Sequence, residues 1–446
     1  MGSHDEVHSL PTRFFRWLLQ LDRPVPPYTA GQLAAFVERN YRWNASVNLV
    51  DGLTYWLGLS LISSSTIVPL FISKLTSSTL PIGLAAMVAQ GGWYLPQLFT
   101  ANWVERLPRR KPAVANLGLV AERLPAWIAA LAAILSGKWA IPGLVLFLLA
   151  YSWRALGGGA LGPAWQDMIA RVIPVDRRGR IWGLTSSLGV GLGVAGSLLS
   201  VWLLRTYSFP TSFVYIFALA ATVITAGWFF LALTREPAIP VTAPRQSQRQ
   251  FLANLPHLLR QDPPFRRFVV ARVLLSLGAM GAGFLTLSAI RRWGVSDSTV
   301  GIYTAVLLLG QTAGNLGFGL LADRRGHKLP LEWAALAYCA AFLLAWLAPV
   351  PSWYYAVFAL LGIATGSVTV SGIMVVLEFC EPERRPTYAG ITNTSVGLAS
   401  IAGPLLATAL ASIHVGWAFA LSAAVSLVAW AVMRWSVEEP RWAATP

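Results

Sequence analysis

Charged side chains are scarce in this chain of 446 residues, where Asp, Glu, Lys and Arg together make up 12%. Soluble domains carry roughly 25%, so the chain lacks the polar surface that two or three soluble domains would need. Two cysteines, Cys339 and Cys380, are too few for a disulfide framework, and the five histidines form no metal-ligand cluster. The sequence also has no phosphate-binding loop and no Ser/His/Asp group. We therefore expect a protein that is not an enzyme, binds no metal or cofactor, and does not use ATP directly.

Long apolar stretches take the place of polar surface. Hydrophobic residues make up 55% of the chain, and stretches of about 20 residues, each able to cross a bilayer core of roughly 30 Å, recur along it. They predict an all-α integral membrane protein with about twelve transmembrane helices. The predicted spans lie near residues 46–73, 80–102, 112–136, 139–163, 181–204, 212–233, 267–290, 299–321, 330–348, 353–377, 387–411 and 415–435.

The net charge of +15 is distributed along the chain in a way that indicates orientation. Most of the 34 Lys and Arg fall at the termini and in alternate loops. The other set of loops contains only Lys74, Lys138, Arg205, Arg291 and Arg292. Because basic loops stay in the cytosol, we expect a multi-pass protein of the cell (inner or plasma) membrane with both termini cytoplasmic. The basicity thus predicts a lipid bilayer and no nucleic acid as partner.

The two halves of the chain resemble one another. Residues 177–185 match residues 384–392, and the Glu-Pro pairs at 236–237 and 439–440 each end a six-span half. The predicted domains are a cytoplasmic N-terminal amphipathic region (1–43), an N-terminal six-helix bundle (44–235), a cytoplasmic central loop (236–265), a C-terminal six-helix bundle (266–437) and a cytoplasmic tail (438–446). Within the first region, residues 10–21 predict an amphipathic helix that docks on the inner leaflet or the bundle. Thr29 predicts the cap of a second short helix that runs to about Tyr41.

The segment from Gly319 to Lys328 reads GLLADRRGHK. It resembles the loop signature of the major facilitator superfamily, Gly-x-Leu-Ala-Asp-Arg-x-Gly-Arg-Lys, and a degenerate copy with Glu105 in place of the aspartate follows the second span. The resemblance covers roughly residues 44–440. It implies two pseudo-symmetric six-helix bundles, transport by alternating access, and a central cavity lined by spans one, four, seven and ten.

The residues of this loop also suggest a gate on physical grounds. Gly319 permits close helix packing, Asp323 caps or pairs at a helix end, and Gly326 permits a tight turn. Charge clusters of this kind can form in one conformation and break in another, so we predict a cytosolic gate. In the second half its basic members are Arg324, Arg325 and Lys328, with Glu378 and Glu383 as partners. In the first half they are Arg106, Arg109 and Arg110, with Asp167 and Asp176 as partners and Glu105 in the place of Asp323. The alternative is that these charges only fix topology and cap helices.

Five of the ionisable residues inside predicted spans stand out, and a charged group deep in a span costs at least ~2.5 kcal/mol on insertion scales. They are Asp51, Glu122, Arg123, Arg154 and Arg272, and we take them as candidates for proton coupling. The segment from Arg154 to Ala160 resembles the fourth-span signature Arg-x-x-Gln-Gly-x-Gly of proton-coupled drug exporters, with Gly157 in place of the glutamine. A guanidinium that moves relative to a carboxylate changes its proton affinity; Glu122 is the first candidate carboxylate and Asp51 the second. Glu122 and Arg123 should point about 100° apart on an α-helix. The alternative role is a static ion pair that holds spans one, three and four together.

Polar and aromatic residues of the four central spans are candidates for the cavity lining. They are Tyr55, Trp56, Ser60, Ser63, Ser64, Trp153, Ser276, Thr286 and Thr365. A lining with so few charges suits a small, mostly apolar solute. We therefore expect a monomeric secondary active transporter that exports such a compound and is driven by the proton gradient. The alternatives are an uptake permease or uniporter for a small metabolite, a non-transporting membrane sensor with a transporter fold, and an intramembrane enzyme.

Overall fold

The computed structural model describes residues 10–104, 106–240, 259–379 and 385–439, and every regular element in these ranges is helical. The first half contains α1 (Leu10–Leu18), α2 (Ala30–Leu61), α3 (Ile67–Ser73), α4 (Leu80–Val104), the π-helical turns η1 (Ala113–Leu117) and η2 (Leu119–Arg123), α5 (Leu124–Ser136), α6 (Ala140–Val172), α7 (Val175–Thr206) and α8 (Thr211–Ala232). The second half contains α10 (Pro263–Gly278), the 3₁₀ turn η3 (Ala279–Phe284), α11 (Leu285–Trp293), α12 (Asp297–Arg325), α13 (Lys328–Leu347), α14 (Trp353–Glu378), α15 (Arg385–Ile413) and α16 (Val415–Ser436).

These elements form the twelve-helix fold that the sequence predicts. In the described part of the chain, ten helical segments are long and apolar enough to cross a membrane. The remaining two spans are α4 and α2, and α2 carries five buried polar residues, Asn40, Asn44, Asn48, Asp51 and Ser60. Spans one and seven are both interrupted, span one between α2 and α3 and span seven at η3. Breaks at equivalent places are typical of transporters with internal repeats.

The N-terminal helices confirm one prediction and correct another. The Thr29 hydroxyl accepts the Gln32 N–H at 3.3 Å, and the Gln32 side chain accepts the Thr29 N–H at 3.0 Å, which is a capping box. The prediction that this helix stops near Tyr41 is wrong. The helix continues without interruption to Leu61, because no proline or glycine separates the capped segment from span one.

Each half is held together by close helix crossings. A side chain at Gly159 of α6 would lie less than 3.0 Å from the Gly92 carbonyl oxygen of α4. A side chain at Gly362 of α14 would lie equally close to the Leu307 carbonyl oxygen of α12. These two crossings are at equivalent places in the two halves, and small residues are what lets helix backbones approach in this way.

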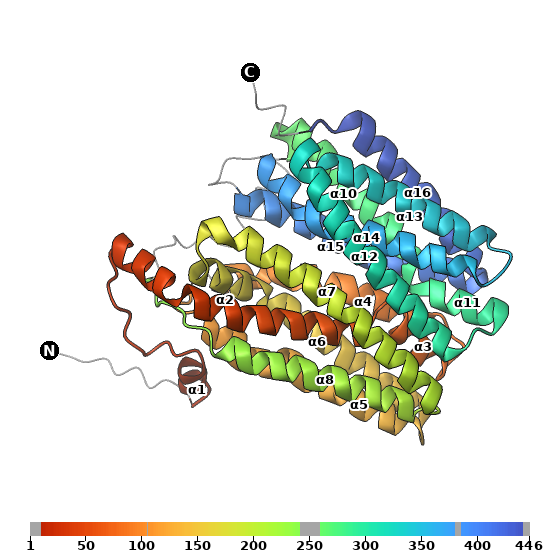
Figure 1. Cartoon of the computed structure of the whole chain (residues 1–446), viewed down its shortest axis with the longest axis horizontal. Coiled ribbons are helices and arrows are strands. Elements are labelled where there is room, and N and C mark those ends of the chain that lie inside the picture. The colour runs from red at the N-terminus through yellow and green to blue at the C-terminus, as the bar shows by residue number, and fades with distance from the viewer. Residues whose placement is uncertain (1–9, 105, 241–258, 380–384, 440–446) are drawn as a thin grey trace.

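The two halves lie side by side, with α4 packed against α15 and α7 against α12 (Figure 1). Polar contacts also join them at the end that carries α3 and α11, here called the far end. The Thr304 hydroxyl donates to the Thr66 hydroxyl at 2.6 Å, and Lys74 Nζ lies 2.7 Å from Asp297 Oδ1. The opposite end, where α8 ends and α10 begins, is called the near end. The far end is therefore closed by direct contacts between the halves.

Candidate functional site

Two adjacent charged residues, Glu122 and Arg123, occupy the π-helical turn η2 and are both buried. Arg123 Nη1 lies 3.4 Å from Glu122 Oε2 and donates to the Gly118 carbonyl at 3.4 Å. The expectation that the two side chains point in different directions is therefore wrong. A π-helical turn holds more residues than an α-helical one, and such turns are frequent at functional sites.

The structure brings four of the five predicted intramembrane charges together, here called the buried charge cluster. Asp51 of α2 lies within electrostatic range of Arg123 and Glu122. Tyr55, one turn further along α2, has Glu122, Arg154 and Arg123 as its electrostatic neighbours. The cluster thus consists of two acids and two bases, Asp51 and Glu122 with Arg123 and Arg154.

The buried charge cluster is incompletely hydrogen-bonded. Within the described residues, Asp51 Oδ1, Glu122 Oε2, Arg123 Nε and Arg154 Nε are buried and have no hydrogen-bond partner. Buried polar atoms without partners are uncommon in proteins. Asp51 Oδ1 and Glu122 Oε2 accept no hydrogen bond from the described residues, although Glu122 Oε2 is 3.4 Å from Arg123 Nη1. Both carboxylates can accept a proton, so the arrangement has the chemical capacity for protonation inside the membrane.

The glycines of α6 explain why the cluster departs from the exporter signature. A side chain at Gly157, where that signature has glutamine, would lie less than 3.0 Å from the Ala121 carbonyl oxygen. At the neighbouring Gly158, an added Cβ would be 3.4 Å from Glu122 Oε1. Because α6 approaches η2 this closely, the structure has no room for a glutamine side chain at position 157. Glu122 packs against the backbone of α6 at Gly158.

Arg272, the fifth predicted charge, lies apart from the others in the second half. It is buried on α10, and its electrostatic neighbours are Tyr94 and Tyr338. The sequence places Asp51 and Arg272 in equivalent spans, but the structure does not bring the two together.

Most of the predicted cavity residues lie at a helix break or contact a neighbouring helix. Ser63 and Ser64 are in the break between α2 and α3. Ser276 Oγ is 3.1 Å from Ser400 Oγ, and Thr365 Oγ1 is 3.3 Å from the Tyr338 hydroxyl. Trp56 packs over Gly189 of α7. These residues bring hydroxyl groups and aromatic surface to the facing helices.

Three predicted cavity residues have other surroundings. Trp153 is 42% exposed on the same stripe of α6 as Leu149 and Leu156. This stripe faces away from the side that carries Arg154, and its apolar exposure is that of a lipid-facing surface. Thr286 is fully buried at the far end and donates to the Ser65 carbonyl at 2.8 Å, and Ser60 is buried against the glycines of α7. Spacing alone does not separate the lipid-facing side of a central span from its cavity side.

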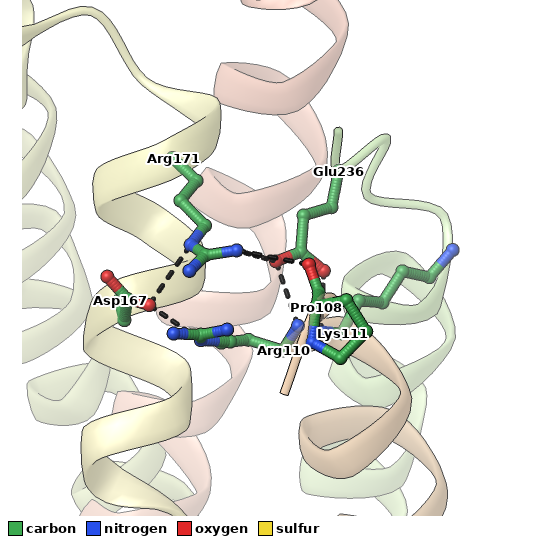
Figure 2. Close-up of polar contacts among 6 residues, drawn as sticks. All are labelled: Pro108, Arg110, Lys111, Asp167, Arg171 and Glu236. Carbon is green, nitrogen blue, oxygen red and sulfur yellow. Dashed lines mark hydrogen bonds and ion pairs between the residues drawn. The ribbon is translucent and has the colours of Figure 1, made fainter. Parts of the chain in front are cut away.

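At the near end, a network of charges surrounds the start of the third span (Figure 2). The Glu236 carboxylate accepts the backbone N–H of Arg110 at 2.9 Å and of Lys111 at 2.7 Å. Asp167 receives two cations, Arg110 Nε at 2.7 Å and Arg171 Nε at 3.0 Å. The predicted pairing of Arg110 with Asp167 is therefore present. A carboxylate at a helix N-terminus satisfies N–H groups that have no partner within the helix and interacts favourably with the helix dipole.

Burial changes the protonation behaviour of this network. Desolvation raises the pKa of Glu236 even though two backbone N–H groups and Arg171 act against the increase. Desolvation also lowers the pKa of Arg110 and of Lys111. The network is thus tightly packed, and it pairs Glu236 with backbone donors more closely than with Arg171, whose Nη1 is 4.0 Å away.

The second half has an equivalent contact. Glu439, at the second Glu-Pro pair, accepts the backbone N–H of Lys328 at 3.0 Å at the start of the ninth span. Gly326 has φ +84 and lies against the Glu439 carboxylate, where a side chain would clash. The predicted turn at Gly326 is confirmed. Sequence reasoning noticed the repeated Glu-Pro pairs but did not identify Glu236 and Glu439 as site residues; the repeat was the available signal.

The other predicted gate residues have different surroundings. Arg109 donates to the Arg23 and Pro24 carbonyls at 3.4 and 2.7 Å, so it binds the N-terminal segment rather than a carboxylate. Gly319 makes no close backbone approach, since its nearest neighbour is a Val370 methyl 3.9 Å from an added Cβ. Arg106, Arg324 and Arg325 are exposed and Glu378 is half-buried. Glu105 and Glu383, and the side chains of Asp176 and Asp323, lie outside the described part of the chain.

Comparisons with known proteins agree with the fold. Residues 280–446 match the family model described as Major Facilitator Superfamily. Over 263 residues the chain is 24% identical to the uncharacterized MFS-type transporter YfkF of Bacillus subtilis (strain 168), covering 56% of this chain and 62% of the relative. It is 27% identical over 152 residues to the steroid transmembrane transporter SLC22A24 of Microcebus murinus, covering 33% of this chain and 27% of the relative. Each match spans less than two thirds of the relative's length.

Solved structures cover nearly the whole fold. A D-xylose-proton symporter superposes with a TM-score of 0.66 at 15% identity, over 89% of this chain and 98% of that one. The nucleoside transporter NupG (D323A mutant) gives a TM-score of 0.62 at 14% identity, over 87% and 99%. Fold and comparisons together support a multi-pass membrane transporter of the type found in the major facilitator superfamily, whose family model matches the second half of the chain.

Proposed function

We propose that the protein is a proton-coupled exporter of a small, mostly apolar compound and works by alternating access. The buried charge cluster carries this proposal. Within the described residues, Asp51 and Glu122 each keep a buried oxygen without a hydrogen-bond donor, and Arg123 is an electrostatic neighbour of both. A static structural pair would be expected to satisfy all of its polar atoms. Incomplete pairing favours a site that exchanges protons.

Coupling would follow from movement of α2 and α6 relative to η2. Asp51 comes from α2, Glu122 and Arg123 from η2, and Arg154 from α6. A change in the distance between a carboxylate and a guanidinium changes the proton affinity of the carboxylate. Protonation would therefore favour one arrangement of these helices over the other, and Tyr55 lies where a bound solute could respond to the change.

The polar contacts at the far end supply one gate of the cycle. With both termini in the cytosol, as the basic loops indicate, the far end would face outward. The Thr66–Thr304 and Lys74–Asp297 contacts would then seal the outer side. The near-end network of Arg110, Asp167 and Glu236 would then act as the cytosolic latch that holds the first bundle together during the movement.

Uniport or uptake of a metabolite is the second candidate. It is favoured by the direct Glu122–Arg123 contact of 3.4 Å, which lies within one helical turn and could persist through a cycle without proton exchange. In that case the cluster would hold spans one, three and four together. A non-transporting sensor would bind solute and show no flux.

The test is flux in proteoliposomes that carry the purified protein under an imposed pH gradient, with a panel of lipophilic dyes and small metabolites. Uphill movement that a protonophore abolishes is the expected result. Flux that runs only downhill and ignores the pH gradient would support the uniporter instead. Binding without any flux would support the sensor.

A further inference from the structure

Arg272 is a buried cation without a counter-ion among the residues that the structure describes. Its side chain lies on α10 and is only 5% exposed. In the described ranges of the chain, no ion pair or hydrogen bond involves its guanidinium, and Nε is buried without any partner. Its electrostatic neighbours are two tyrosines, Tyr94 and Tyr338, and no carboxylate.

This isolation distinguishes Arg272 from the other buried arginines. Arg123 and Arg154 share a cluster with two acids, so the charges of that cluster balance. Arg110 is as buried as Arg272 but lies 2.7 Å from Asp167 Oδ2. Arg292 is exposed and donates to the Ala345 and Ala348 carbonyls at 3.0 and 2.6 Å. A guanidinium deep in a span is expensive unless something compensates it, and such residues usually face the bundle interior or a substrate pathway.

The position of Arg272 is where the two halves meet. Tyr94 comes from α4 of the first half, whereas Tyr338 comes from α13 of the second. On α14, a Cβ added at Gly372 would lie 2.8 Å from Arg272 Nη2, so the guanidinium packs against this glycine and occupies the space of a side chain. Thr365 Oγ1 lies 3.3 Å from the hydroxyl of its neighbour Tyr338, and Ser276 is one turn along α10.

We propose that Arg272 binds the acid group of the transported solute, which is an amphipathic organic anion with a carboxylate or a chemically similar group on a mostly apolar body. A guanidinium binds carboxylates through paired charge-assisted hydrogen bonds, and Tyr94, Tyr338 and Thr365 offer further hydroxyl contacts. The inference rests on the proposed transport function and specifies its substrate class. Export of an anion would also be favoured by an inside-negative membrane potential.

The test compares carboxylates with their uncharged amides on purified protein in lipid nanodiscs. The pairs are benzoate and benzamide, 2-naphthoate and 2-naphthamide, indole-3-acetate and indole-3-acetamide, and decanoate and decanamide. Affinity is measured by tryptophan fluorescence quenching. At least one carboxylate should bind tenfold or more tightly than its amide. Amides that bind as well as carboxylates in every pair, or no binding by any carboxylate, would overturn the proposal.

Variants then assign any preference to the residue. Arg272→Gln should abolish the preference for the carboxylate, Arg272→Lys should retain part of it, and the exposed-site control Arg205→Gln should leave it unchanged. If Arg272→Gln does not fold, the loss of bidentate geometry in Arg272→Lys still predicts a severalfold weaker carboxylate affinity. A preference that survives both changes would place the anion site elsewhere.

Flux separates this inference from the proposed function. If proton-driven flux of the amides were as fast as that of the carboxylates, the anion site would be contradicted and the proposed exporter function would still be supported. Binding of carboxylates that depends on Arg272, with no flux in proteoliposomes, would support the anion site and contradict the exporter.

Discussion

Replacement of Glu236 by alanine should destabilise the near end of the first bundle. The Glu236 side chain is 1% exposed and accepts two backbone N–H groups at the start of the third span. Leaving a buried donor without an acceptor costs about 1–3 kcal/mol, so loss of both bonds predicts a decrease of about 2–6 kcal/mol in the free energy of unfolding.

Glutamine at the same position separates hydrogen bonding from charge. Glu236→Gln keeps one carbonyl oxygen as acceptor and removes a charge whose burial is unfavourable, as the raised pKa of Glu236 indicates. Its loss of stability should therefore be less than half that of Glu236→Ala. The matched control is Glu38→Ala, because Glu38 forms an exposed pair with Arg177 at 3.0 Å, and such pairs contribute about 0–1 kcal/mol.

The assay is SDS-induced unfolding in mixed micelles, followed by tryptophan fluorescence, with all three variants prepared in parallel. If Glu236→Ala were as mild as Glu38→Ala, the Glu236 carboxylate would not stabilise the helix start. If Glu236→Gln were as damaging as Glu236→Ala, charge rather than hydrogen bonding would be the source of the stability.

Three further predictions follow from the same contacts. Because burial raises the pKa of Glu236 above its usual 4.5, the folded protein binds a proton at this carboxylate more tightly than the unfolded chain does. The wild type should therefore gain stability relative to Glu236→Gln as the pH falls from neutral toward 4.5. A difference in melting temperature between the two that does not change with pH would contradict this. Gly326→Ala should lower the melting temperature, since φ is +84 and the new Cβ would clash with Glu439; Gly31→Ala, with open space around it, is the control. A disulfide between Thr66→Cys and Thr304→Cys, whose hydroxyls are 2.6 Å apart, should stop flux reversibly; full flux in the oxidised protein would contradict alternating access.

The fold could be predicted from the sequence because apolar length and basic loops are properties of the chain itself. Helix length follows from bilayer thickness, and the repeated segments alone indicate two bundles. The continuous α2 shows the limit of such reasoning: the cap at Thr29 was identified, but nothing in the sequence between Tyr41 and the span stops the helix, so the predicted break was wrong.

The site was less predictable, because side-chain direction depends on local geometry. The π-helical turn η2 lets Glu122 contact Arg123, and regular α-helical spacing did not predict this. Trp153 was assigned to the cavity because its span is central, but it lies on the exposed stripe of α6. Glu236 and Glu439 accept hydrogen bonds from backbone N–H groups. Every residue type except proline has such a group, so the sequence does not reveal these partners.

Proton coupling through the buried charge cluster is the central claim, and flux under an imposed pH gradient tests it most directly. Wild-type proteoliposomes would be compared with Glu122→Gln, Asp51→Asn and Arg154→Ala, at matched protein content and with binding measured in parallel. We predict that at least one carboxylate variant still binds solute but loses uphill movement. Uphill flux that survives all three substitutions would contradict the claim and leave the cluster with a structural role.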